Sequence, residues 1–119
     1  MDEALREISY AAKFDEDGPG TGPGMAYHVH LGKTLHKKGQ FEEAIEAFTN
    51  GIPKQPSYYY VRFHRALSYE AVGDLLAAKT DLQYVLQKEL AFRRNAGLSI
   101  EDIDSNLREA LRRFQLHPK

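Results

Sequence analysis

The sequence predicts an all-α protein built from antiparallel helix pairs, and three observations lead to this prediction. Apolar residues recur at the spacing of amphipathic helices along most of the chain, for example at Phe41, Ala44, Ile45 and Phe48. Runs in which apolar and polar residues alternate, as they do in strands, do not extend far enough to predict a sheet. The helical pattern also repeats, because positions 34 residues apart carry similar residues, and this is typical of stacked helical hairpins.

Six helices are expected, and each has its own apolar stripe or breaker residues. They span about 2–14, 25–38, 41–52, 58–72, 74–95 and 99–115. A loop at 15–24 follows the first helix, because the glycines and prolines of Gly18–Gly24 are incompatible with a helix or a strand. Gly97 ends the fifth helix. The last helix begins near Ser99, which forms a capping-box-like start with Asp102, and we expect it to cover the exposed face of the preceding helices.

The repeat is clearest when residues 25–58 are shifted by 34 positions onto 59–92. Small residues then coincide with small ones and large with large: Gly32 with Ala66, Leu35 with Tyr69, Gly39 with Gly73, Phe41 with Leu75, Ala44 with Ala78, and Phe48 with Leu82. Small residues at fixed positions predict that two helices approach closely there, with large side chains filling the adjoining holes. The paired glycines Gly39 and Gly73 predict turns with positive φ.

These residues resemble the signature of the tetratricopeptide repeat (TPR) family. The segment 25–56 matches it through Leu31, Gly32, Leu35, Gly39, Phe41, Ala44, Phe48, Gly51 and Pro56, with His28 where the family prefers Trp. The segment 59–92 resembles a second repeat through Ala66, Tyr69, Gly73, Leu75, Ala78, Leu82 and Val85. It departs from the pattern at Arg62 and Arg65, where large apolar residues are usual, and at Leu90, which replaces the closing proline.

The resemblance implies a right-handed superhelix within a single domain, 1–119. Its parts are an N-terminal half-repeat at 2–14, the flexible loop at 15–24, full repeats at 25–58 and 59–92, and a C-terminal capping helix within 93–119. The half-repeat is suggested by residues 2–11, which are similar to the second helix of an earlier repeat. Beginning in mid-repeat fits either a piece of a longer protein or a homodimer that supplies the missing surface through the N-terminal half-repeat.

Composition and charge exclude several classes of protein. Sixteen Lys and Arg against seventeen Asp and Glu leave a net charge of −1, so no global attraction to nucleic acid or to an anionic membrane is expected. The absence of cysteine excludes disulfides, Cys-ligated metals and thiol nucleophiles. No apolar run is long enough to cross a bilayer, and the acidic start is unlike a secretory signal, which predicts a cytoplasmic protein.

No catalytic residue, metal site or cofactor is predicted, so the chain is not expected to be an enzyme. Gly32-Lys33-Thr34 is similar to the end of a phosphate-binding loop, but Tyr27 stands where that loop requires glycine. No two of the five histidines have the i, i+4 spacing of a helical zinc site. Paired carboxylates fall on polar faces, and no serine lies in a nucleophile-elbow context.

A partner-binding groove is expected on one face of the first helix of each repeat. Counting 100° per residue from the packing positions assigns to this face the residues Val29, Lys33, His36, Lys37, Tyr60, Phe63, Leu67 and Glu70. An apolar and aromatic strip beside lysines marks either a binding site or a surface that the chain covers itself, for example with its last helix.

Two peptide modes fit this groove. An amphipathic helix would place acidic residues toward Lys33 and Lys37, and a proline-rich segment would stack on the tyrosines. The resemblance adds a third mode, in which lysines and asparagines clamp the C-terminal carboxylate of a chaperone. We disfavour it because Lys33 and His64 stand where the asparagines are expected.

The function expected from these observations and the resemblance is non-catalytic protein–protein interaction, as an adaptor, a scaffold or a co-chaperone-like module. One alternative is an RNA-binding helical repeat that uses the arginines near the C-terminus, Arg93, Arg94, Arg108, Arg112 and Arg113. Acidic residues interleave with these arginines, which favours a salt-bridged surface instead. Another alternative is a regulatory or substrate-recognition segment of a larger enzyme.

Overall fold

The structure is a computed structural model that describes residues 24–117, and within this part of the chain it contains helices and no strand. The α-helices are α2 (Met25–Lys37), α3 (Phe41–Gly51), α4 (Tyr60–Ala71), α5 (Leu75–Ala96) and α6 (Ser105–Arg113). Two short 3₁₀ helices, η1 (Ile52–Lys54) and η2 (Ile100–Asp102), follow α3 and α5. The helix expected at 2–14 and the loop up to residue 23 lie outside the described residues. The all-helical prediction is confirmed for residues 24–117.

The C-terminal segment differs from the single helix expected over 99–115. Two capping residues in succession divide it. The Ser99 hydroxyl accepts a hydrogen bond from the N–H of Glu101 at 3.1 Å and starts η2. The Asp104 carboxylate accepts from the N–H groups of Asn106 and Leu107 at 3.0 and 3.1 Å and starts α6. A polar side chain that satisfies free N–H groups begins a new helix, so each cap produces its own.

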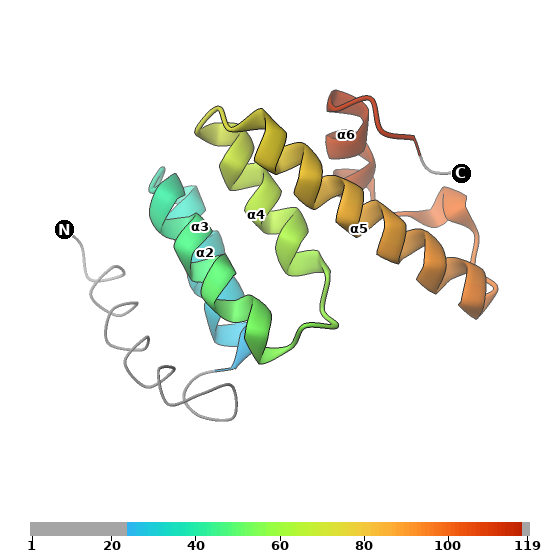
Figure 1. Cartoon of the computed structure of the whole chain (residues 1–119), viewed down its shortest axis with the longest axis horizontal. Coiled ribbons are helices and arrows are strands. Elements are labelled where there is room, and N and C mark those ends of the chain that lie inside the picture. Colours follow the sequence, from blue (N-terminus) through green and yellow to red (C-terminus); the bar gives the residue numbers. More distant parts are fainter. Residues whose placement is uncertain (1–23, 118–119) are drawn as a thin grey trace.

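The helices form pairs in a row, with α2 packed on α3, α3 on α4, and α4 on α5 (Figure 1). The turn inside each pair is the same structure repeated. Gln40 donates its N–H to the carbonyl of Leu35 at 2.9 Å, and Asp74 does so to Tyr69 at 2.9 Å, 34 residues later. Gly39 and Gly73 have φ of +81° and +87°, which confirms the predicted left-handed turns. The 34-residue repeat in the sequence is thus a repeat in backbone structure.

Within the pairs, small residues mark the closest contacts. Ala44 and Ala78 are completely buried. A Cβ added to Gly32 of α2 would lie 2.4 Å from the Phe48 ring of α3, so no other residue fits without movement. In the second pair Ala66 and Leu82 stand at these two positions, and both are buried. A smaller side chain on one helix leaves room for the extra methyl group on the other.

The core consists of two clusters that meet at α4. The first joins α2 and α3 to the start of α4 through Met25, Leu31, Leu35, Ala44, Ala47, Phe48 and Val61. The second joins α4, α5 and the C-terminal segment through Phe63, Ala66, Ala78, Leu82, Val85, Ile103, Leu107, Ala110 and Leu111. Helix α6 lies at the end of the row opposite α2 and α3 (Figure 1). Its inner residues are almost fully buried, so it forms part of the core.

An ion pair replaces apolar packing at the position where the second repeat departs from its pattern. The Arg65 guanidinium donates two hydrogen bonds to the Asp81 carboxylate, at 2.7 and 2.8 Å, and a third to the Thr49 hydroxyl at 3.2 Å. The hydrogen bonds to Asp81 raise the pKa of Arg65. Arg62 lies 3.7 Å from the same carboxylate and stacks over Tyr84. Helices α4 and α5 are therefore joined by a largely buried ion pair, and an exposed hydrogen bond links it to α3.

Candidate partner-binding groove

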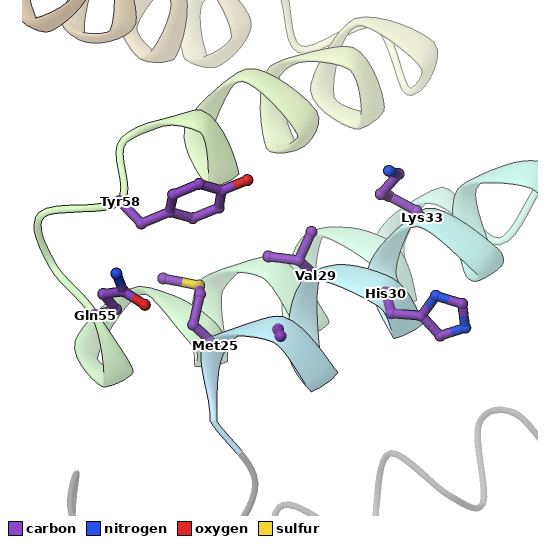
Figure 2. Close-up of a pocket in the computed structure, with 7 residues that line it drawn as sticks. Met25, Val29, His30, Lys33, Gln55 and Tyr58 are labelled. Carbon is purple, nitrogen blue, oxygen red and sulfur yellow. The ribbon is translucent and has the colours of Figure 1, made fainter.

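Two adjoining hollows lie along α2 on the side that faces α4, and they share Lys33. The first has a volume of about 390 Å³ and is lined by Met25, Ala26, Val29, His30, Lys33, Gln55 and Tyr58 (Figure 2). The second has a volume of about 150 Å³ and is lined by Lys33, His36, Lys37, Phe48, His64 and Leu67. We call the two hollows together the α2–α4 groove.

The wall formed by α2 is one stripe of a helix. Its lining residues follow one another at steps of one or three, so they share a face: Met25, Ala26, Val29, His30, Lys33, His36 and Lys37. The buried residues Leu31 and Leu35 lie on another face and hold α2 against the core. The sequence of α2 therefore determines both which residues pack against the core and which residues line the groove.

The opposite wall and the floor come from later elements. Figure 2 shows the Tyr58 ring across the first hollow from Met25 and Val29, while the His30 ring points away from it. In the second hollow His64 of α4 stacks on Phe48 of α3, with ring centroids 5.9 Å apart.

A partly buried hydrogen bond links α2 to α4 beside this floor. The His36 Nδ1 and the Ser68 hydroxyl lie 2.8 Å apart, and Ser68 is completely buried. This hydrogen bond therefore fixes the position of α2 relative to α4 along the groove.

The charged side chains that line the groove are all basic. Lys33 and Lys37 are exposed at its rim, and no Asp or Glu lines either hollow. Burial, with Lys33 and His36 nearby, lowers the pKa of His64 to about 4, so this ring is neutral at pH 7. Burial also lowers the pKa of His36. At neutral pH the groove thus presents two ammonium groups above an apolar and aromatic floor.

The structure brings together five of the eight groove residues expected from the sequence. Val29, Lys33, His36, Lys37 and Leu67 line the hollows. The other three, Tyr60, Phe63 and Glu70, do not line the hollows, because they contact the C-terminal segment or α5. Of these, Phe63 is only 6% exposed and packs in the same core cluster as α6.

Glu70 also contacts α6 instead of facing a free groove. Its carboxylate accepts two hydrogen bonds from the Arg113 guanidinium of α6, at 2.8 and 2.9 Å. These bonds raise the pKa of Arg113. The part of α4 that was expected to continue the groove is therefore covered by the chain itself.

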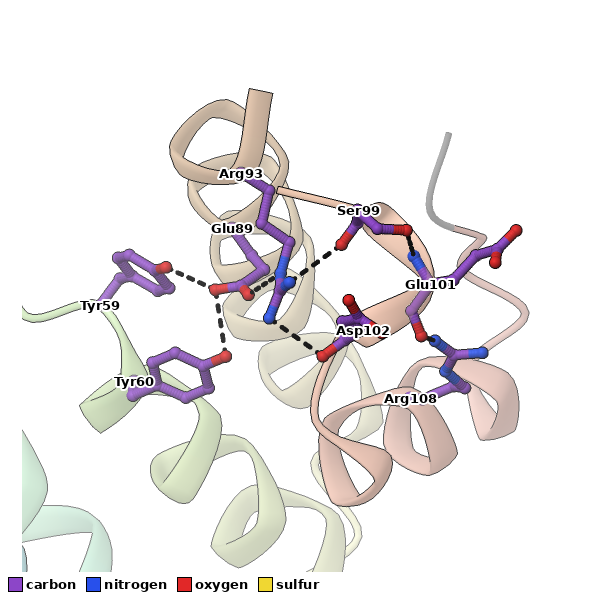
Figure 3. A network of polar contacts seen from close by, with 8 residues as sticks. All are labelled: Tyr59, Tyr60, Glu89, Arg93, Ser99, Glu101, Asp102 and Arg108. Atoms are coloured by element: carbon purple, nitrogen blue, oxygen red, sulfur yellow. Dashed lines mark hydrogen bonds and ion pairs between the residues drawn. The ribbon is translucent and has the colours of Figure 1, made fainter. Parts of the chain in front are cut away.

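Tyr60 belongs to a polar network that joins α4, α5 and η2 (Figure 3). The hydroxyl groups of Tyr59 and Tyr60 donate to the buried Glu89 carboxylate at 2.5 and 3.0 Å, and Arg93 donates to it at 2.5 Å. Burial opposes ionisation of Glu89, but these hydrogen bonds outweigh it and hold the pKa of Glu89 below its usual value. Burial and the bond to Glu89 raise the pKa of Tyr60 to about 12.

The same Arg93 holds the segment that leads to α6. Its guanidinium donates to the carbonyl of Ser99 at 2.9 Å and to that of Asp102 at 3.1 Å (Figure 3). Tyr59 and Tyr60 stack on each other at 5.0 Å. Both phenol groups are thus committed to an internal network.

Sequence reasoning missed several groove residues. Met25, Gln55 and Tyr58 line the first hollow, and Phe48 and His64 form the floor of the second. Phe48 was expected only as a core residue. The aromatic cluster Tyr58-Tyr59-Tyr60 was the signal available for Tyr58, but the sequence does not show which of three consecutive tyrosines turns toward α2.

The C-terminal arginines are largely engaged with protein groups. Arg93 binds Glu89, Arg112 lies 3.0 Å from Glu109, and Arg113 binds Glu70. Arg108 donates to the Glu101 carbonyl. Of the acidic residues that interleave with these arginines in the sequence, Glu109 supplies one of the ion pairs, and Glu89 and Glu70 supply the others.

Within residues 24–117 no group of three or more His, Asp or Glu is placed to hold a metal ion. None of the helices in that range has the length and apolar character needed to cross a bilayer.

Comparison with known proteins gives partial likenesses. The chain is 34% identical over 65 residues to human DnaJ homolog subfamily C member 3, a stretch that covers 55% of this chain and 13% of that protein. It is 38% identical over 81 residues to UBA domain-containing protein 7 of Schizosaccharomyces pombe, covering 63% of this chain and 11% of that protein. The chain thus spans about one eighth or less of the length of these relatives. No protein-family model and no solved structure matches it.

Proposed function

We propose that this chain is a non-catalytic protein-interaction module of TPR-like helix pairs, which binds a segment of a partner protein in the α2–α4 groove. The observation that carries the proposal is the pair of adjoining hollows, in which apolar floor and exposed lysines lie side by side. Concave sites of this kind, mostly apolar with a few placed polar groups, are where proteins bind ligands.

The helical architecture supports the same reading. Two helix pairs with an identical turn 34 residues apart fit the TPR-like stacking that the sequence resembles. The likeness to DnaJ homolog subfamily C member 3 supports a helical protein-interaction module. A cytoplasmic location is part of the same proposal.

The proposal is tested by selecting ligands and mapping where they bind. A displayed library of random peptides of about 12 residues, long enough for three helical turns, is selected against the full chain. Binding of the enriched peptides is then measured for Val29→Asp and Lys33→Glu, which alter the groove, and for Leu76→Asp and Lys79→Glu, which make matched changes on exposed positions of α5.

We expect the groove variants to lose about tenfold or more in affinity and the α5 variants to bind as the unaltered chain does. Circular dichroism of every variant verifies that the helices are intact. Peptides that bind all four variants equally well, or a selection that yields no binder, would refute the groove as the interaction site.

A further inference from the structure

The polar chemistry of the groove restricts the kind of segment that it can accept. Lys33 and Lys37 have no ion-pair partner among residues 24–117, and no carboxylate lines the hollows. Glu70, the one acidic residue of α4, was expected in the groove but is bound by Arg113. A segment carrying carboxylates opposite the two lysines is complementary, and a basic segment would be repelled.

The shape of the lining favours a helix as the bound segment. The α2 residues that line the groove run from Met25 to Lys37, about three turns or ~18 Å of helix at 1.5 Å per residue. Among them Val29, Lys33 and Lys37 lie in an i, i+4 row and form a ridge, and a ridge on one helix packs into the side-chain grooves of another helix. A partner helix of about the same length would cover it.

Within this protein, an amphipathic helix already packs in this way on the surface next to the groove. Helix α6 lays Leu107, Ala110 and Leu111, which follow the i, i+3, i+4 pattern, onto the core cluster that includes Phe63 of α4. Leu67 packs against this cluster and also lines the second hollow, so the site of α6 and the α2–α4 groove share a border. The exposed part of the groove is thus continuous with a surface that binds an amphipathic helix.

An extended proline-rich segment would not find in the α2–α4 groove the surface that it requires. Such segments dock between exposed aromatic rings. Tyr59 and Tyr60 stack on each other, and their hydroxyl groups bind Glu89, so they are committed elsewhere. Tyr58 alone of the three tyrosines lines the groove.

We infer that the occupant of the α2–α4 groove is an amphipathic helix of a partner protein, with its apolar face on Val29, Phe48 and Leu67 and with acidic residues facing Lys33 and Lys37. This inference rests on the proposed function and specifies its ligand. The bound helix lies along α2, on the side that faces α4.

The test compares three displayed peptide libraries of equal size and length. All three have about 12 variable positions. One fixes leucines at i, i+3, i+4 and i+7 with glutamates flanking them, the second has lysines in place of the glutamates, and the third carries PxxP repeats. Enrichment against the full chain is measured for each, and the best binder of each library is synthesised for affinity measurements.

We expect the acidic helical library to be enriched and its best binder to gain helicity on binding. A Lys33→Glu/Lys37→Glu double variant should lose about tenfold or more in affinity for it and gain affinity for the basic helical peptide. Lys79→Glu on α5 is the control, and it should change neither affinity. Rising salt should weaken binding of the acidic peptide to the unaltered chain.

The two proposals fail in different ways. If the basic or proline-rich peptides bind best and Val29→Asp still abolishes their binding, the groove is the site but its occupant is not an acidic helix. If the charge reversal leaves the preference for acidic peptides unchanged, the inference is overturned as well. If no peptide responds to Val29→Asp, the groove itself is not the interaction site.

Discussion

At the scale of single residues, the contact of Gly32 with Phe48 shows how tightly the first helix pair is fitted. A methyl group at Gly32 would meet the Phe48 ring at 2.4 Å. We expect Gly32→Ala to lower the free energy of unfolding by about 1–3 kcal/mol through overpacking. Chemical denaturation followed by circular dichroism measures the change.

The second helix pair supplies the compensating change. It carries Ala66 and Leu82 where the first pair carries Gly32 and Phe48. Phe48→Leu alone should also destabilise, by about 1–2 kcal/mol, because it leaves a cavity. The Gly32→Ala/Phe48→Leu double variant should be more stable than the sum of the single changes predicts. Strict additivity would show that the two residues do not share one contact.

His64 should make stability depend on pH. Its pKa in the folded chain is about 4, below the ordinary value of 6.5, so the unfolded chain takes up the proton first as the pH falls. The contribution of His64 to the free energy of unfolding is therefore fully present above about pH 6.5, and it is lost progressively as the pH falls toward 4. A single group contributes at most about 1.4 kcal/mol per pH unit to this slope.

The variant His64→Gln tests this dependence. We expect it to flatten the dependence of the unfolding free energy on pH between about 6.5 and 4, with a remainder from His36, whose pKa is also lowered. His30→Gln, at an exposed position of α2, is the control. An unaltered slope in His64→Gln would mean that the ring is not buried as described.

At the scale of elements, periodicity predicted the helices well because each pattern is local. The stripe at Phe41–Phe48 and the turns at Gly39 and Gly73 need no knowledge of distant residues. The break between η2 and α6 was missed because the apolar spacing continues through it. Two adjacent caps decide the break, and the backbone there turns so that Ile103 is buried.

The Arg65–Asp81 pair is a second feature that spacing could not predict. The sequence showed that Arg65 departs from the repeat pattern, but only the structure shows that Asp81 of α5 compensates for it. The equivalent residues of the first pair are Leu31 and Ala47, both buried. The same position is therefore filled by apolar packing in one pair and by an ion pair in the other.

We expect Asp81→Ala to lower the free energy of unfolding by about 3–5 kcal/mol, because it leaves the Arg65 charge largely buried without its partner. The Arg65→Leu/Asp81→Ala double variant restores the residues of the first pair, and most of the lost stability should return. Urea denaturation of the three variants measures both effects. A double variant as unstable as Asp81→Ala alone would contradict this account.

At the scale of the whole molecule, the groove was only partly predictable. The α2 wall was found because angular counting works within one helix, whereas the α4 part of the prediction was changed by a helix far along the chain. Phe63 and Glu70 do lie on one side of α4, but α6 packs against that side and covers them. Contacts between distant segments are not encoded in local spacing, so the sequence could not show which residues stay accessible.

The C-terminal helix should be a major source of stability. Leu111→Ala removes a side chain that is 1% exposed and should cost about 2–5 kcal/mol. Arg113→Ala removes an exposed ion pair with Glu70 and should cost less than about 1 kcal/mol. Thermal melts of both variants, and of the chain lacking 98–119, measure the contribution, and the truncated chain should bind a hydrophobic dye. A truncated chain with an unaltered melting curve would show that α6 is dispensable.

The position of α6 also limits how a further hairpin could join the row of helices. Because Leu107, Ala110 and Leu111 already occupy the inner side of α4 and α5, another hairpin could contact that side directly only by displacing α6. A hairpin added next to this end without disturbing the core would therefore have to pack on the outer face of α6.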